Sequence, residues 1–134
     1  MRWILSPTDH QQAQDMGGKA RALADLNRAS FPIPNWFVIR GESCLESLGE
    51  IGRSKLAASR NAAEIQELLK DLKPDAAIME EINWGLSNLC KTDGFVAVRS
   101  SASDEDGADY SFAGQLDSYL FVAPDRVAER IVDV

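Results

Sequence analysis

Residues 95–122 read FVAVRSSASDEDGADYSFAGQLDSYLFV and hold the most informative pattern in the chain. The stretch opens with an apolar run, 95–98, and closes with another, 119–122. A run with no polar alternation is typical of a strand buried on both faces. Arg99 follows the first run, where its guanidinium can fork two donors onto a phosphate, and the two serines after it add hydroxyls. The pattern predicts two buried strands joined by a polar, anion-binding loop.

Simpler interpretations of the same residues stay open. An arginine at the end of an apolar strand is about as often an exposed or ion-paired residue. The acidic run 104–109 fits a solvated turn better than a metal site, because it lacks the spacing and distal glutamate of a calcium loop. Taken by itself, the stretch indicates only that something anionic is bound.

A second motif, Gly-Gly-Lys at 17–19, precedes a segment with helical spacing of apolar residues from Ala20 to Leu26. Glycines before a helix let its first N–H groups approach a phosphate, and the helix dipole favours the negative charge. The motif is not a Walker A loop, since Ala13 and Ala20 stand where that loop needs glycine and a hydroxyl residue. Composition alone favours a solvated lysine at position 19.

Together the two motifs resemble the phosphoenolpyruvate synthase and pyruvate, phosphate dikinase family, whose signature rifampin phosphotransferases share. VRSSASDEDGADYSFAGQLDSYL matches without a gap the family pattern V-R-S-S-A-T-x-E-D-x-x-x-x-S-F-A-G-Q-x-x-T. The segment from Gly17 to Phe37 is similar to the family's G-G-K, helix and V-P-x-P-x-x-F order. Two departures are Trp36, where the family usually has glycine, and Gly107-Ala108, where it often has Leu-Pro. The resemblance covers essentially the whole chain but only the beginning of the family's longer protein.

The resemblance implies an α+β fold, with a small mixed sheet covered by helices, like the N-terminal lobe of an ATP-grasp-like nucleotide-binding domain. We expect residues 1–134 to form a single domain that is this lobe, as a fragment of a longer protein. A helical pattern that begins at Pro124 reaches Val134 without a stop signal, which favours a fragment.

The resemblance also implies the site. Lys19 and Arg99 would hold the phosphates of ATP, with Arg99 as the catalytic cation. Gly114 would contribute by close backbone approach and Ser118 by its hydroxyl, where the family usually has threonine. The carboxylate that binds Mg²⁺ lies in the family's second lobe, so we expect no metal ligand in this chain. The lone histidine, His10, lies in a polar run and is interpreted as part of a solvated loop.

The resemblance implies that the parent enzyme passes phosphate from ATP to a histidine on a separate domain and then to pyruvate, as in phosphoenolpyruvate synthase. Alternatives are a rifampin- or glucan-type dikinase and a non-catalytic module that senses ATP or mediates assembly. The expected partners are ATP, the second lobe and the phosphohistidine domain. The isolated fragment is expected to be inactive.

Composition sets further limits. A formal charge of −7 argues against binding to nucleic acid or to an anionic membrane surface. No apolar stretch approaches the length of a membrane span, and the first residues have too short an apolar core for a signal peptide, so we expect a cytoplasmic protein. The two cysteines, Cys44 and Cys90, are predicted to be reduced and buried.

The remaining pattern predicts the scaffold. Apolar runs predict strands at 3–5 and 36–39, and spacing predicts helices at 41–48, at 65–72 and from 74 to 89. The last two helices are expected to cover one side of the sheet. A fragment cut within its last helix should leave apolar side chains uncovered and so self-associate; the candidates are Val127, Ile131 and Val134.

Overall fold

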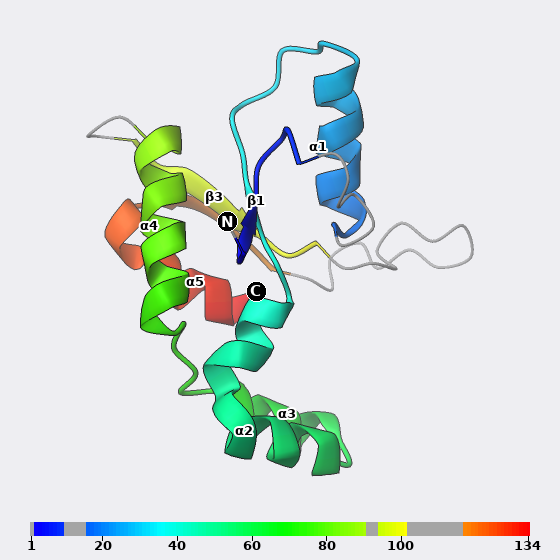
Figure 1. Ribbon diagram of the computed structural model, residues 1–134, viewed down its shortest axis with the longest axis vertical. Helices are drawn as coiled ribbons and strands as arrows, with labels where there is room; N and C mark the ends of the chain where they lie inside the picture. Colours follow the sequence, from blue (N-terminus) through cyan, green and yellow to red (C-terminus); the bar gives the residue numbers. More distant parts are fainter. Residues whose placement is uncertain (1, 10–15, 91–93, 102–116) are drawn as a thin grey trace.

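The computed structural model describes residues 2–9, 16–90, 94–101 and 117–134, which form a mixed arrangement of helices and short strands (Figure 1). In chain order the elements are β1 (Ile4–Leu5), α1 (Gly18–Arg28), β2 (Val38–Ile39), α2 (Glu42–Ala58), α3 (Ala62–Leu69), α4 (Ala76–Leu89), β3 (Val96–Arg99), β4 (Ser118–Val122), the 3-10 helix η2 (Pro124–Arg126) and α5 (Val127–Asp133).

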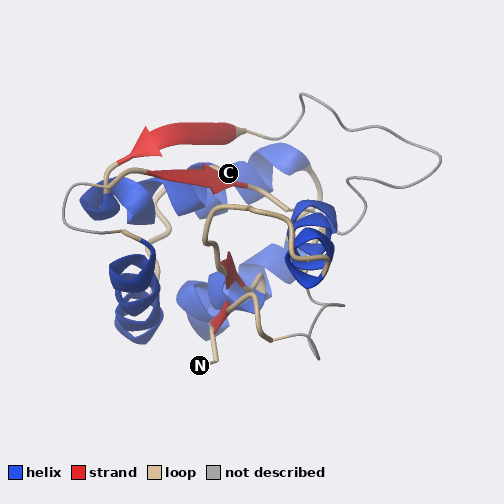
Figure 2. Cartoon of the chain, turned by 90° about the horizontal axis from the view of Figure 1, so that it is seen from above, coloured by secondary structure: helices blue, strands red, loops and turns tan. Residues whose placement is uncertain are grey.

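The described strands form two separate two-stranded antiparallel sheets, β1–β2 and β3–β4. Figure 2 shows the longer β3–β4 hairpin apart from the short β1–β2 ribbon. The expectation of one small mixed sheet is therefore wrong for this part of the chain, although the α+β class is confirmed. Among the described residues, no helix has the length and apolar content that a membrane crossing requires.

The β1–β2 ribbon lies between two hydrophobic clusters. Its register pairs Ile4 with Ile39 and Leu5 with Val38. Successive residues of a strand point to opposite faces, and Ile4 accordingly packs into one cluster while Leu5 packs into the other. Both side chains are buried. The ribbon thus joins the two halves of the structure.

The larger cluster is built by α4, the β3–β4 hairpin and α5 around the Ile4 face. The predicted apolar face of α4 is confirmed, since Ile78, Ile82 and Leu86 are all buried in this cluster. The smaller cluster packs α1 on the Leu5 face through its small residues Ala20 and Ala24. The side chain of Trp36 packs against this smaller cluster, so the indole that replaces the family's usual glycine rests on a neighbouring element.

A carboxylate from α4 fixes the start of the chain. The two carboxylate oxygens of Glu81 accept hydrogen bonds from the backbone N–H groups of Arg2, Trp3 and Ile4, at 3.0, 2.7 and 3.2 Å. Burial by itself would raise the pKa of Glu81, but the three backbone hydrogen bonds stabilise the charged form, and the net effect is a pKa below the ordinary value. These three hydrogen bonds therefore attach the start of the chain and β1 to α4.

The β3–β4 hairpin is buried on one face only, which corrects the prediction of strands buried on both. Residues alternate along β3, so Val96 and Val98 are half-buried against the larger cluster while Ala97 and Arg99 are exposed. Between the pairs Val96–Val122 and Val98–Tyr119, β4 has one residue more than β3, which marks a β-bulge in β4 opposite Ala97. Phe121, with φ of 54°, lies at this bulge and is 81% exposed.

Helices α2 and α3 form a pair at one end of the molecule (Figure 1). No residue of α3 is buried, and Ile65 on its predicted apolar face is exposed. The expectation that α3 covers a sheet is therefore wrong, because α3 packs against α2. α2 also runs beyond the predicted limit of residue 48 and bends at Gly49, which has φ of 65° and ψ of −177°.

Two further expectations need correction. Cys44 is exposed and Cys90 is half-buried, so neither is the buried thiol that was predicted, although both are free. Val127 is buried in the larger cluster, Ile131 packs against that cluster, and Val134 is half-buried. These three residues do not form the exposed patch on which the expectation of self-association rested.

The bend at Gly49 leads to a test by substitution. A methyl group at Gly49 would meet no atom within 4 Å, so only the backbone conformation opposes a side chain there. Its φ and ψ belong to a region that is essentially restricted to glycine. We expect Gly49→Ala to lower the free energy of unfolding by about 1–3 kcal/mol in urea denaturation.

Gly41 is the matched control. Its surroundings are equally open but its φ is −58°, so the free energy of unfolding of Gly41→Ala should stay within about 0.5 kcal/mol of wild type. Equal losses in both variants would contradict this account.

The role of Glu81 can be tested through pH. Because its pKa is lowered on folding, its contribution is present above the unfolded pKa of about 4.3 and is lost as the pH falls through the folded value. We expect Glu81→Gln to lower the free energy of unfolding at pH 7 by about 1–3 kcal/mol. The difference from wild type should shrink below about pH 4. Glu80→Gln, at the exposed neighbouring carboxylate, should change little, and an equal effect at both positions would refute the assignment.

Candidate functional site

The two sequence motifs meet where α1 begins and β3 ends. The hydroxyl oxygen of Ser101 accepts a hydrogen bond from the backbone N–H of Ala20 at 3.1 Å, although 81 residues separate the two. Lys19 precedes Ala20 in the first turn of α1, and Arg99 is the last residue of β3, two residues before Ser101. The fold therefore places the backbone segments that carry both predicted cations beside each other.

Gly17 makes this approach possible. A Cβ built on Gly17 would lie 1.8 Å from the backbone oxygen of Ser101 and 2.2 Å from its carbonyl carbon. Any side chain at position 17 would thus overlap the backbone that follows β3, which cannot move as a flexible side chain can. The first glycine of the motif is explained by this close contact between chain segments.

Arg99 and Ser118 are neighbours across the β3–β4 ladder. The register places Arg99 directly opposite Ser118, at the end of the hairpin where the connecting residues leave it. Directly opposed residues in an antiparallel pair share one face, with Cβ atoms about 5 Å apart. Both residues are exposed, so a guanidinium and a hydroxyl lie together on the outer face of the hairpin.

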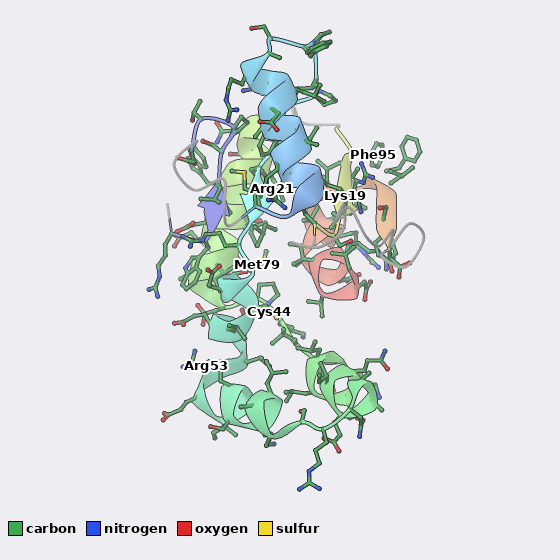
Figure 3. The ribbon with its side chains drawn as sticks, turned by 90° about the vertical axis from the view of Figure 1, so that its right-hand side faces the viewer. Lys19, Arg21, Cys44, Arg53, Met79 and Phe95 are labelled. Atoms are coloured by element: carbon green, nitrogen blue, oxygen red, sulfur yellow. The ribbon has the colours of Figure 1, made fainter. Side chains whose placement is uncertain are left out.

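Of the four predicted site residues, the structure brings the chain positions of three together. Lys19 is half-buried at the N-terminal end of α1 (Figure 3). Gly114 lies outside the described residues, as do the acidic run 104–109 and the lone His10. Phosphate binding by Lys19, Arg99, Gly114 and Ser118 remains a prediction.

The start of α1 suits an anion electrostatically. A helix begins with N–H groups that have no partner within the helix and with the positive end of its dipole. The first turn of α1 holds no acidic residue, and Gly17 provides no capping side chain. Lys19 adds a formal positive charge in the same turn.

Ser100 carries an unusual hydroxyl. Its oxygen is buried and has no hydrogen-bond partner among the described residues. A buried hydroxyl without a partner costs free energy, because it has lost its hydrogen bonds to water. This serine is therefore not explained by the packing of the described part of the chain.

Neither a metal centre nor a cavity among the described residues extends the site. No group of three or more His, Cys, Asp or Glu side chains in the described part of the chain could hold a metal ion. A cavity of about 220 Å³ lies among α2, α3, α4 and α5. Its lining is mostly apolar and includes no cation and no predicted site residue. Cys44 lines this cavity, and although the residue as a whole is exposed, desolvation of its thiol raises the pKa of that group.

Comparison with known families identifies the domain. The family described as "Pyruvate phosphate dikinase, AMP/ATP-binding domain" matches residues 13–134, which include both motifs and nearly all of the fold. The chain belongs to this family. The resemblance first seen in the two motifs is thereby confirmed, and so is the assignment of the chain to an AMP/ATP-binding domain. No solved structure gives a significant match.

Curated relatives of this dikinase AMP/ATP-binding domain include a probable phosphoenolpyruvate synthase of Archaeoglobus fulgidus, 32% identical over 95% of the chain. The phosphoenolpyruvate synthase of Pyrococcus furiosus is 33% identical over 86% of the chain. The prodigiosin synthesizing transferase PigC of Serratia marcescens is 33% identical over 87%. The chain spans only 19%, 14% and 13% of the lengths of these three proteins.

Sequence reasoning missed the contact between Ser101 and the start of α1. The sequence held only an indirect signal for this contact. In this chain α1 begins after Gly17, at a position where Ser, Thr, Asp or Asn would normally cap a helix. A helix without a local cap leaves an N–H group for another segment to satisfy. The pattern of the motif showed that something was needed, but not which residue provides it.

Substitution of Ser100 tests whether its buried hydroxyl has a hydrogen-bond partner. If no other group satisfies it, Ser100→Ala removes an unpaired polar group and should leave stability unchanged or raise it by up to about 1 kcal/mol. Thermal unfolding of the two proteins, with Ser43→Ala as the control, measures this. Ser43 is buried and donates to the backbone oxygen of Arg40 at 2.7 Å, so its loss should cost about 1 kcal/mol. A comparable loss at Ser100 would show that its hydroxyl does have a partner.

Proposed function

We propose that this chain provides part of an ATP site in a dikinase-type phosphotransferase, in which Lys19 and Arg99 hold the phosphates. The observation that supports this most is the contact of the Ala20 N–H with the Ser101 hydroxyl, because it brings the glycine-lysine and arginine-serine motifs to one place. Membership of an AMP/ATP-binding family supports the choice of nucleotide.

The proposed site acts by electrostatics. The two cations and the first N–H groups of α1 would neutralise the charge of the transferred phosphate, with Arg99 as the catalytic cation. Ser118, opposite Arg99, would add a hydroxyl donor, and Gly114 would allow close approach of its backbone. Water would be excluded only when another lobe closes over this surface, as in an ATP-grasp-like domain.

The described residues include no group of three or more His, Cys, Asp or Glu side chains that could hold a metal ion, and we assign no step to a metal there. The carboxylate that binds Mg²⁺ would lie in a second lobe. A histidine on a further domain would accept the phosphate and pass it to pyruvate. The name phosphoenolpyruvate synthase, which two of the relatives carry, supports the choice of pyruvate as the final acceptor. The greater length of those relatives leaves room for such domains.

A second acceptor class has one observation in its favour. The relative from Serratia is named as a prodigiosin synthesizing transferase, so this kind of domain also occurs in a protein named for another product. The ATP site is common to both alternatives, and the acceptor would be chosen by other domains.

The proposal predicts weak, charge-dependent ATP binding by this chain. With one wall of the site open to solvent, screening limits affinity to about the millimolar range. We expect Arg99→Ala and Lys19→Ala each to raise the Kd for ATP about tenfold, which corresponds to the loss of one charge-assisted contact. Titration followed by NMR, with and without Mg²⁺, measures this, and the chain alone should release no phosphate.

Arg53→Ala is the control for loss of charge. Arg53 lies on α2, well away from Lys19 (Figure 3), and its guanidinium pairs with Glu46 at 3.4 Å. The control should leave the Kd unchanged within about twofold, since a distant exposed charge is screened by salt. Equal affinity of wild type and Arg99→Ala would show that the site is elsewhere.

A further inference from the structure

The start of α1 obtains its cap from another part of the chain. In most helices a Ser, Thr, Asp or Asn at the N-cap position accepts from the N–H two or three residues later. Here Gly17 occupies the N-cap position and has no side chain, while Ser101 accepts from the N–H of Ala20, the third residue of the helix. The hydroxyl of Ser101 does what a local capping side chain would do.

This arrangement has no obvious substitute. Ala20 is 4% exposed, so water has little access to its N–H if the hydroxyl of Ser101 is removed. A capping side chain cannot be placed at position 17 either, because its Cβ would overlap the backbone oxygen of Ser101. The glycine and the serine therefore depend on each other: close approach requires the first, and the second supplies the cap that the first lacks.

The hydrogen bond between the Ala20 N–H and the Ser101 hydroxyl, which we call the joint, connects the chain segments that carry the two proposed phosphate ligands. Lys19 is covalently next to Ala20, and Arg99 is two residues from Ser101, so the Ala20–Ser101 hydrogen bond helps set the spacing of the two cations. We infer that Ser101 is a positioning residue for the nucleotide site, which holds the first turn of α1 against the end of β3 so that one phosphate group can contact both. This inference rests on the proposed function.

Linkage gives the inference a second consequence. A ligand that binds only when the joint is formed must stabilise the joint in return. ATP should therefore slow hydrogen exchange at the Ala20 amide, by about tenfold at a concentration ten times its Kd. The amide of Ser43, at the start of α2 and remote from both motifs, should not respond.

The test uses the labelled chain, with hydrogen exchange at Ala20 and the Kd for ATP both measured by NMR. The variants are Ser101→Ala, Arg99→Ala, the double variant and the control Ser43→Ala, which loses a hydroxyl at the start of another helix. We expect Ser101→Ala to remove protection at Ala20 and to weaken ATP binding about fivefold, the effect of one ordinary hydrogen bond. Ser43→Ala should bind ATP as wild type does.

The double variant separates positioning from a general loss of structure. If Ser101 acts by setting the distance between the two cations, its removal should matter in the wild-type background and have little effect once Arg99 is gone. A fivefold loss in both backgrounds would overturn the inference in favour of a structural role. So would an Ala20 amide that exchanges at the unprotected rate, or a Ser101→Ala chain that binds ATP with unchanged affinity.

The measurements also separate a failure of the Ser101→Ala variant to fold from a failure of the proposed nucleotide site. If Ser101→Ala does not fold, the wild-type measurement decides: Ala20 protection that does not rise with ATP overturns the inference. If instead Arg99→Ala binds ATP as tightly as wild type, the proposed nucleotide site fails and the inference fails with it. A Kd that responds to Arg99→Ala but not to Ser101→Ala leaves the site in place and removes only the positioning role.

Discussion

The structure depends on the two residues of β1 being buried on opposite faces. Ile4 enters the cluster formed with α4, the β3–β4 hairpin and α5, while Leu5 enters the cluster under α1. A strand this short cannot be stabilised by its own ladder, which pairs two residues with β2. The carboxylate of Glu81 compensates by accepting three backbone N–H groups at the start of the chain.

The position of the candidate site follows from this constraint. α1 packs on one face of the ribbon, the β3–β4 hairpin belongs to the cluster on the other, and the start of α1 meets the segment that follows β3. They do so where Gly17 lies against the backbone of Ser101. The proximity of the two motifs is thus a consequence of the core and not of the motifs alone.

The hairpin presents two kinds of surface. Val96 and Val98 face the larger cluster, while the outer face holds Arg99 and Ser118 beside exposed apolar side chains. The bulge in the register, with Phe121 in the left-handed region, turns one more large side chain outward. The polar pair that we propose as phosphate ligands therefore lies at the edge of an apolar face, including Leu120, which is 64% exposed.

From the sequence we could recognise the family, the two motifs and the elements whose signal is local. The spacing of Ile78, Ile82 and Leu86 was enough to predict a buried helix face, because that periodicity depends only on residues within a few turns. Other features depend on contacts between distant segments, which local patterns cannot encode. An apolar run could not show whether one face of β3 or both would be covered, and the apolar face of α3 could not show that its partner is α2. The contacts of Glu81 with the first strand and of Ser101 with α1 join residues 77 to 81 positions apart. Such pairs meet only in the tertiary structure, so the glycine before α1 could not show that Ser101 supplies the cap.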